Sequence, residues 1–330
     1  MIDLTGNKKI LIVRLGKIGD IIIASGAIEV LKNKFPDVEI SLLTLKKNKE
    51  VLKYNSNIRH LYLTNKNLSL YSKLFLLRKF KYDVLIDLND DPSKTSILIR
   101  KRIHSKITVG FVFNDNNKPD ISVTQPSKSK THIIERIKLL LTSLNAGLDE
   151  IELRPKLFLG ETEKREVIEQ LEQYKDNSKI LAINISAGAP IRYWTADKWI
   201  ALIRKISNSF NDWKFIILST KKDELIKKSI CSTIQQDKLI PQKFYSFQHY
   251  ASYICYSDIL LTPDTAAVHI ASAFNVPVIA LYPNYEWNFI SWQPLSKNYR
   301  SIRSNSESIN NISVDEVYNA FKDILSEIKK

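Results

Sequence analysis

An acidic residue closes a glycine-containing turn near the start of the chain, in the segment Arg14-Leu15-Gly16-Lys17-Ile18-Gly19-Asp20. Two glycines allow the backbone to turn sharply and to approach a ligand closely. Asp20 precedes an apolar stretch, so its carboxylate could take a proton from a bound hydroxyl, or it could cap the next helix, which is worth about 1 kcal/mol. The residues alone leave both interpretations open. The spacing is not the G-x-G-x-x-G of a dinucleotide-binding turn, which counts against an NAD-dependent oxidoreductase.

Two later segments carry groups that suit the oxygens of a diphosphate. In Asn184–Trp194 (NISAGAPIRYW), the small residues around Gly188 offer a hydroxyl and backbone N–H groups, and Arg192 offers a permanently charged fork. In Thr262–His269 (TPDTAAVH), a helix of small residues is expected to begin just after Asp264, and its first N–H groups and its dipole favour an anion. As alternatives, Arg192 could be a surface arginine and Asp264 only a helix cap.

A further segment could hold a metal ion. The carboxylates of Asp87-Leu88-Asn89-Asp90-Asp91 could bind a nucleotide sugar through a divalent cation, but loop solvation and helix capping explain them as well. Cys231 and Cys255 have no metal-ligand spacing, and the five histidines show no paired spacing typical of zinc. No metal and no bound cofactor are therefore expected.

The composition is that of a globular protein with an excess of positive charge. Its 330 residues suffice for two domains, and 49 Lys and Arg against 35 Asp and Glu give a formal charge of +14. The excess fits a partner with phosphates, whether nucleic acid, an anionic membrane face or a phosphorylated substrate, and the Lys- and Asn-rich composition explains it as well. No apolar stretch reaches the roughly 20 residues that cross a bilayer, and no cleavable leader precedes the first strand, so a cytoplasmic protein is expected.

Short β-branched runs alternate with longer amphipathic segments, which is the pattern of βαβ units with parallel sheets. In the first half, strands are expected at 9–15, 38–45, 59–63, 83–88 and 107–113, with helices at 21–35, 69–80 and 132–146. The pattern restarts with strands at 179–185, 214–219, 258–262 and 276–282, and with helices at 196–210, 222–235, 266–274 and 314–328. A link is expected at 153–160. Because ligands bind at the carboxyl ends of parallel strands, the segments described above lie where a site is expected.

Taken in order, these segments resemble the heptosyltransferases of glycosyltransferase family 9. ILIVRLGKIGDIIIASGAIEVLKNKFPDVEI is similar to the family's opening strand, Gly-Asp turn, helix and second strand, and YDVLIDLNDDPSKTSILI resembles its "yDvviDlqgl.ksa" segment. ISAGAPIRYWTADKWIALI resembles "pGa....KrWp.e.wa.L", and DILLTPDTAAVHIASAFNVPVIALYP resembles "vvs.DsGpmHlAaAlgtPvvalfGp", the most specific match of the four.

The resemblance implies an α/β protein with the GT-B fold, in which two Rossmann-like parallel-sheet domains face each other across a cleft. The acceptor-side domain would span residues 1–155, and the domain that binds the nucleotide sugar would span residues 156–312. A helix at 313–330 could pack back on the first domain.

The same resemblance assigns roles residue by residue. Asp20 matches the catalytic aspartate, a general base that deprotonates the acceptor hydroxyl for in-line attack with inversion. Arg192 matches the basic residue, usually Lys, that meets the donor diphosphate. The other donor-binding positions are Ser186, Ala187, Gly188, Asp264, Thr265, Ala266 and His269, and the ribose-binding acid is either Asp223 or Glu224.

Three departures from the family pattern bear on the sugar and the base of the donor rather than on the fold. Ala266 stands where the family has Gly. Asp90 replaces the Gly of "DlqG". The turn Tyr282-Pro283-Asn284-Tyr285 replaces a "YGPT"-like turn.

The implied reaction is transfer of a heptose or a related sugar from a nucleotide diphosphate donor, with ADP-heptose as the default, to a lipopolysaccharide core-type acceptor. The enzyme would act in the cytoplasm or in peripheral contact with the cytoplasmic face of the inner membrane, without a nucleic-acid partner. Basic residues of the first domain would meet the phosphates of the anionic glycolipid, namely Arg14, Lys17, Lys94, Arg100, Arg102 and Lys130. The alternatives are another sugar nucleotide, a protein or capsule acceptor, and a non-catalytic scaffold that binds polyanions.

Overall fold

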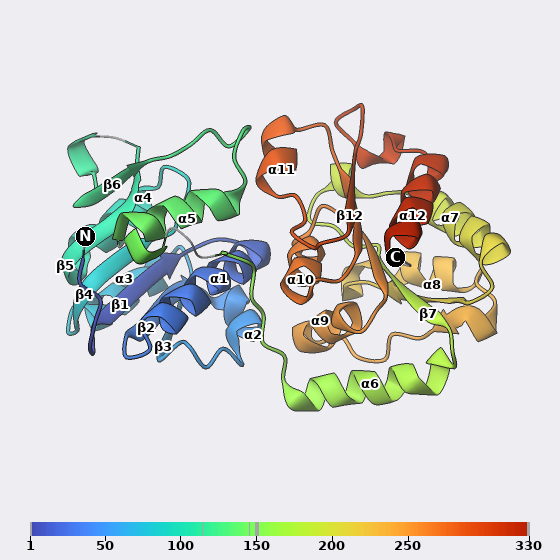
Figure 1. The fold of residues 1–330 in the computed structure, drawn as a ribbon, viewed down its shortest axis with the longest axis horizontal. Helices are drawn as coiled ribbons and strands as arrows, with labels where there is room; N and C mark the ends of the chain where they lie inside the picture. Colours follow the sequence, from blue (N-terminus) through green and yellow to red (C-terminus); the bar gives the residue numbers. More distant parts are fainter. Residues whose placement is uncertain (1, 114, 145, 149–151, 329–330) are drawn as a thin grey trace. The chain divides into compact units, whose positions relative to one another are not determined.

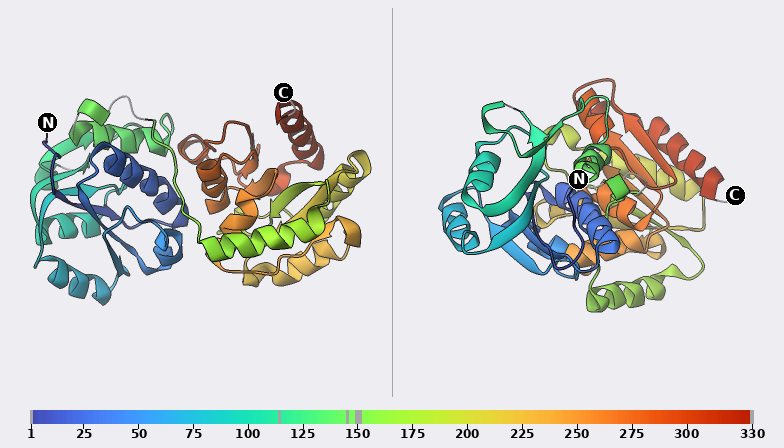
Figure 2. Two further views of the ribbon diagram at one scale, coloured as in Figure 1. Left: turned by 60° about the horizontal axis from the view of Figure 1, so that its bottom comes forward. Right: turned by 60° about the vertical axis from the view of Figure 1, so that its left-hand side comes forward.

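The chain folds into two units. The structure, a computed structural model, describes residues 2–113, 115–144, 146–148 and 152–328. The units are Met1–Phe158 and Leu159–Lys330, so the division lies slightly beyond the boundary expected after residue 155 and within the predicted link. Each unit contains one six-stranded parallel sheet with helices on both of its faces (Figures 1 and 2), which confirms the α/β class.

The sheet of the first unit has the strand order β3-β2-β1-β4-β5-β6. Its central strands are continuous apolar runs because helices cover both faces of the sheet. The order reverses beside β1, where the chain crosses from one side of this strand to the other. All neighbouring strands are parallel, and they are β1 (Lys9–Arg14), β2 (Glu39–Leu45), β3 (His60–Thr64), β4 (Lys81–Asp87), β5 (His104–Val112) and β6 (Ile121–Thr124).

Helices α3 and α4 share one face of this sheet, where Leu70, Leu74, Leu77 and Ile99 join a core formed by strand residues. Helices α1 and α5 contact each other. The helix expected at 132–146 ends at Leu144, and Asn145 lies outside the described residues. The helices are α1 (Ile18–Lys34), α2 (Lys49–Leu52), α3 (Leu68–Leu77), α4 (Lys94–Arg102) and α5 (Ile133–Leu144), with 3-10 turns at Lys46–Asn48, Asp115–Asn117 and Ala146–Leu148.

The sheet of the second unit has the order β12-β11-β10-β7-β8-β9, again parallel throughout. Here the order reverses between β7 and β10. The strands are β7 (Lys179–Asn184), β8 (Trp213–Leu218), β9 (Leu239–Ile240), β10 (Ile259–Pro263), β11 (Val278–Tyr282) and β12 (Tyr299–Arg303).

The helices of the second unit divide between the two faces of its sheet. On one face, Trp199, Trp213 and Phe321 anchor a core that includes the last helix of the chain. On the other face, α9 contacts both α6 and α10. The helices are α6 (Glu161–Lys175), α7 (Ala196–Ser209), α8 (Glu224–Cys231), α9 (Phe247–Cys255), α10 (Ala266–Phe274), α11 (Glu286–Ser291) and α12 (Val314–Ile328), with 3-10 turns at Pro190–Arg192, Lys221–Asp223, Gln236–Lys238 and Ile309–Asn311.

The last helix of the chain belongs to the second unit. Helix α12 contacts α7, β11 and β12, and the rings of Phe321 and Trp213 meet edge to face with their centroids 5.1 Å apart. Among the described residues, no helix combines the length and the apolar character needed to span a membrane.

Candidate functional site

Asp20 lies at the carboxyl edge of the first sheet, where the strand order reverses beside β1. Helix α1 begins at Ile18 with Lys17 as its N-cap, so Asp20 is the third helical residue and not the cap. Its Oδ2 accepts a hydrogen bond of 2.6 Å from the backbone N–H of Lys17, and its Oδ1 accepts one from Nη2 of Arg14. The side chain is 16% exposed. It is a fixed carboxylate that solvent, and hence a ligand, can reach.

Gly16 makes room for this carboxylate. A Cβ atom at position 16 would lie 2.5 Å from Cγ and 2.7 Å from Oδ2 of Asp20, closer than real Cβ atoms approach other atoms. The carbonyl of Gly16 accepts a hydrogen bond of 3.2 Å from Asn48 Nδ2, which ties the turn to the residues after β2. The glycine that the sequence associates with a sharp turn therefore has a specific task, since it allows the Asp20 side chain to lie over the backbone.

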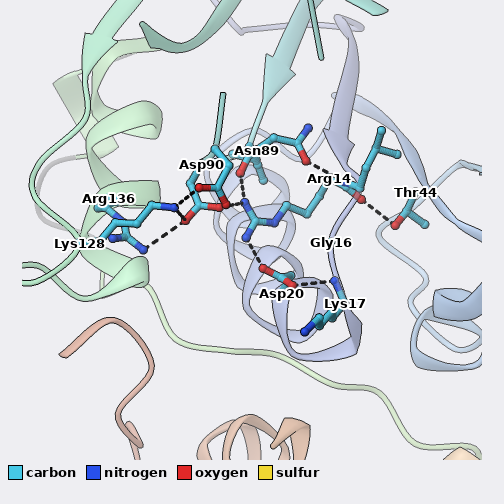
Figure 3. A network of polar contacts seen from close by, with 12 residues as sticks. Arg14, Gly16, Lys17, Asp20, Thr44, Asn89, Asp90, Lys128 and Arg136 are labelled. Atoms are coloured by element: carbon cyan, nitrogen blue, oxygen red, sulfur yellow. Dashed lines mark hydrogen bonds and ion pairs between the residues drawn. The ribbon is translucent and has the colours of Figure 1, made fainter. Parts of the chain in front are cut away.

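Arg14, the last residue of β1, joins Asp20 to Asp90 (Figure 3). Its Nη1 donates to Asp90 Oδ1 at 2.8 Å and to the carbonyl of Leu88, and its Nη2 donates to Asp20. The side chain is 2% exposed. Burial opposes the charge of this guanidinium, but the two carboxylates outweigh burial and raise the pKa of Arg14 above its ordinary value. Arg14 is thus a buried cation that orients Asp20.

Asp90 binds a second buried arginine. Arg136 of α5 has Nη2 3.2 Å from Asp90 Oδ2, and Lys128 Nζ lies 3.8 Å from the same oxygen (Figure 3). Burial raises the pKa of Asp90, but the charges of Arg14, Lys128 and Arg136 outweigh this effect, so the pKa lies below its ordinary value. Asp90 therefore neutralises cations from β1, from the loop before α5 and from α5 itself.

Basic side chains hold the carboxylates at the end of β4 and just after it. Asp87 Oδ2 lies 2.5 Å from Arg100 Nη1, and Asp91 pairs with Lys128. Across the described residues, no group of three or more His, Cys, Asp or Glu side chains is arranged to hold a metal ion. These ion pairs use the same oxygens that the alternative of a metal-binding cluster required.

Two of the basic residues expected to meet the acceptor are engaged inside the first unit. Arg14 is buried between two carboxylates, and Arg100 is bound by Asp87 and, at 2.9 Å, by the carbonyl of Asn117. In this structure, both charges stabilise the loops after the strands. The remaining four side chains are exposed, and they are Lys17, Lys94, Arg102 and Lys130.

In the second unit, the loops after the neighbouring strands β7 and β10 meet at Asn184. This residue ends β7 and is 1% exposed. Its Nδ2 donates to Thr262 Oγ1 at 2.9 Å, to Thr265 Oγ1 at 3.3 Å and to the carbonyl of Ser186 at 3.1 Å. Two loops that the sequence indicated separately are thereby held together at the point where the strand order reverses.

Ser186 and Asp223 connect this point to the loop after β8. Ser186 Oγ donates to Asp223 Oδ2 at 2.5 Å and accepts from the N–H of Thr220 at 2.8 Å. Tyr193 OH donates to Asp223 Oδ1 at 3.2 Å and to the carbonyl of Ala187 at 2.9 Å. Asp223 is buried, so its carboxylate holds loops together, whereas the next residue, Glu224, is only partly buried.

Arg192 reaches from the 3-10 turn after β7 to the segment after β10. Its Nη1 lies 3.1 Å from the carbonyl and 3.2 Å from Oδ2 of Asp264, and Oδ2 also accepts 2.6 Å from Asn288 Nδ2. Asp264 is buried and is not the helix cap, because Thr265 caps α10 through a 3.3 Å bond from the N–H of Ala267. The Arg192 side chain is 27% exposed, so it is not the free surface arginine of the alternative interpretation.

The remaining residues predicted to bind the sugar donor lie in the loop after β7 and in α10. A Cβ atom built at Gly188 would find no atom within 4 Å, so open space surrounds this loop position. Ala187 is buried, and Ala266 begins α10 directly after the capping residue Thr265. His269, one turn into α10, is buried and lies edge to face with Trp292, with the ring centroids 5.6 Å apart.

The sequence analysis did not single out Asn288, Tyr193 or Arg136 as site residues. Arg136 carried a signal that could have been used, because it stands three residues after Ile133 and four before Leu140, on the buried stripe of α5. Tyr193 lies within the segment Asn184–Trp194 and Asn288 lies three residues after the turn at 282–285, and no spacing in the sequence indicates their partners.

The chain is similar to one protein family over most of its length. The model of glycosyltransferase family 9 (heptosyltransferase) matches residues 75–319. The chain is 24% identical to "Putative lipopolysaccharide heptosyltransferase 4" of Escherichia coli K12 over 93% of its own length and 84% of the relative. It is 23% identical to lipopolysaccharide heptosyltransferase 1 of Campylobacter coli, over 84% of its length and 85% of that protein.

Solved structures confirm the fold. A glycosyltransferase family 9 protein from Veillonella parvula matches with a TM-score of 0.82 at 20% identity, covering 98% of both chains. The Escherichia coli heptosyltransferase WaaC with ADP matches with a TM-score of 0.72 at 13% identity, over 96% of this chain and 99% of WaaC. The two parallel sheets and these matches confirm the GT-B fold that the resemblance implied.

Proposed function

Because the chain belongs to glycosyltransferase family 9, we propose that it transfers heptose or a related sugar from an ADP-linked donor to a lipopolysaccharide core-type acceptor. Relatives named lipopolysaccharide heptosyltransferases support this acceptor, and the structures of WaaC with ADP and with an ADP-linked fluoro-heptose support the donor. With an acceptor of this class, the proposed reaction would take place at the cytoplasmic face of the inner membrane.

The observation that carries the donor assignment is the position of Arg192 at the carboxyl ends of β7 and β10. Its guanidinium adjoins the start of α10, where backbone N–H groups and the helix dipole favour an anion. The diphosphate would bind between Arg192 and this helix, beside Gly188 and Thr265, and this combination of charges requires no metal ion. Asp223 already accepts three side-chain donors, so Glu224 is the better candidate to bind the ribose.

On the acceptor side, Asp20 would act as the general base. It would take the proton of the attacking hydroxyl while that oxygen forms the new bond to the anomeric carbon and the ADP leaves from the opposite face, so the configuration inverts. Arg14 and the Lys17 N–H orient the carboxylate before the substrate arrives. The experiment that tests this proposal is a transfer assay with ADP-heptose and a lipopolysaccharide core acceptor, in which the anomeric configuration of the product is determined by NMR.

Donor binding gives a direct prediction for Arg192. In calorimetric titrations with ADP, UDP, GDP and CDP, we expect ADP to bind. The Arg192→Ala substitution should lower the affinity for ADP by roughly tenfold or more, because a charge-assisted contact is lost. EDTA should leave the affinity unchanged. Preference for another diphosphate would replace the ADP-linked donor with a different sugar nucleotide. Binding of none of them, together with no transfer, would favour the non-catalytic scaffold.

A second prediction concerns Gly16. The Gly16→Ala substitution should lower the transfer rate by about 10²-fold, because a displacement of about 1 Å in a reacting group can cost that much and the new Cβ atom forces the Asp20 carboxylate to move. The affinity for ADP should stay at the wild-type value. An unchanged rate in a folded variant would show that the position of Asp20 over the turn is not needed.

A further inference from the structure

Helix α3 has a second apolar face that the first unit does not cover. Its inner leucines join the core described above, whereas Leu68, Tyr71 and Phe75 are 85%, 60% and 68% exposed. Leu68, Tyr71 and Phe75 are spaced by three and four positions, so they share one side of the helix. Position 70, which faces the core, lies about half a turn away from position 68. Leu76 and Phe80 are exposed as well and extend the outer face past the end of the helix. An exposed apolar surface of this kind marks an interaction site.

The charged residues on α3 and next to it in the sequence are all basic. Lys66, Lys73, Arg78, Lys79 and Lys81 lie on or beside α3, and no Asp or Glu occurs between Glu50 and Asp83. Within the described part of the chain, none of these five side chains pairs with a carboxylate. Lys79 Nζ lies 5.7 Å from the centroid of the Phe75 ring, so one cation already adjoins the apolar stripe.

We propose that this outer face of α3, defined by Leu68, Tyr71, Phe75, Leu76 and Phe80 with the five basic residues, docks on an anionic phospholipid surface. Apolar and aromatic side chains enter the boundary between head groups and acyl chains, while lysine and arginine stems reach the phosphates. A second copy of the chain would bring the same uncompensated positive charges together and is disfavoured. An anionic phospholipid surface offers acyl chains to the apolar side chains and phosphates to the basic ones.

The position of this docking face is consistent with a reaction at the carboxyl edge of the first sheet. Helix α3 begins just after β3, where the N–H of Asn65 donates to Ser69 Oγ at 2.9 Å and Asn67 caps the helix. All six strands are parallel, so this end of α3 lies at the same edge of the sheet as Asp20. The proposal goes beyond the transfer reaction, because docking requires neither the donor nor the acceptor.

The test is flotation of the full-length protein with vesicles. We expect binding to vesicles of phosphatidylglycerol and phosphatidylethanolamine in equal parts, weak binding to pure phosphatidylcholine, and release at high salt. The triple variant Leu68→Ser, Tyr71→Ser, Phe75→Ser should lower the bound fraction by roughly tenfold, and so should replacement of Lys66, Arg78 and Lys79 by Gln. Circular dichroism establishes that each variant is folded.

A matched control comes from α8 in the second unit, where Leu225 is 82% exposed and Ile226 is 40% exposed. The Leu225→Ser, Ile226→Ser variant should bind vesicles as the wild type does. No binding of wild type to the acidic vesicles, or equal loss in this control, would overturn the proposal. Concentration-dependent dimerisation that the α3 triple variant abolishes would assign the face to a second copy. Because no substrate is present, failure here would leave the proposed transfer reaction untouched.

Discussion

The Asp20→Asn variant is expected to lose transfer activity by about 10³-fold while its affinity for ADP stays at the wild-type value, since general-base catalysis contributes about 10²- to 10⁴-fold. The amide has nearly the same shape as the carboxylate, so it can still accept one hydrogen bond from Arg14 or from the Lys17 N–H. It cannot take a proton from the acceptor hydroxyl. Initial rates of ADP release with acceptor present measure the loss.

Two measurements separate this effect from damage to the fold. A titration with ADP reports the second unit, which holds every residue proposed to bind the donor. A thermal melt reports the stability of the fold, because the substitution weakens the pair of Asp20 with the buried Arg14 in the first unit. Full turnover in a folded Asp20→Asn protein would exclude Asp20 as the general base. Loss of ADP binding would instead show that the substitution perturbs more than proton transfer.

The sequence predicted where the candidate segments lie in the fold when their residues are contiguous and follow a buried strand. The Gly16–Asp20 turn and the Arg192 and Asp264 segments all lie at the carboxyl ends of central strands. Neither Asp20 nor Asp264 is a helix N-cap, as the alternative interpretation had it, because α1 begins before Asp20 and Thr265 caps α10. A helix start can shift by a few residues with little change in local sequence, so periodicity cannot fix it.

Long-range partners could not be predicted in the same way. Arg14 meets Asp90 and Asp90 meets Arg136 across separations of 76 and 46 residues, and no local pattern specifies such pairs. Two of the basic side chains assigned to an acceptor, Arg14 and Arg100, were therefore counted without the carboxylates that already bind them. Arg100 shows this most clearly, since it lies in a basic run at the end of α4 and yet binds the buried Asp87.

The central strands were predictable and three edge strands, β6, β9 and β12, were not. β6 (ISVT) alternates apolar with polar residues, β12 (YRSIR) is mostly polar, and β9 has only two residues, so none of them has the continuous apolar run that identifies a buried parallel strand. The charged helix α6 (ETEKREVIEQLEQYK) was missed for a related reason, since only a narrow apolar stripe distinguishes it. For α12, the amphipathic pattern indicated an apolar face but not the sheet that covers it.

Asp90, which stands where the family pattern has glycine, is expected to be a major source of stability in the first unit. The isosteric Asp90→Asn substitution should lower the free energy of unfolding at neutral pH by about 3 kcal/mol, because it leaves the buried Arg136 and Arg14 without their shared counter-charge. Urea denaturation measures the change. The matched control is Asp91→Asn, since this neighbouring carboxylate is 75% exposed and pairs with Lys128, and its effect should stay within about 0.5 kcal/mol.

The pH dependence of this difference provides a further check. The pKa of Asp90 is lower in the folded protein than its ordinary value, so the folded state holds the carboxylate ionised more strongly than the unfolded chain does. The stabilisation is therefore fully present above the unfolded pKa of about 3.9 and is lost as the pH falls through the lower pKa of the folded state. The gap between wild type and Asp90→Asn should be constant above about pH 5 and should narrow in acid. A gap that persists unchanged in acid would mean that hydrogen-bond geometry, and not the charge of Asp90, stabilises the network.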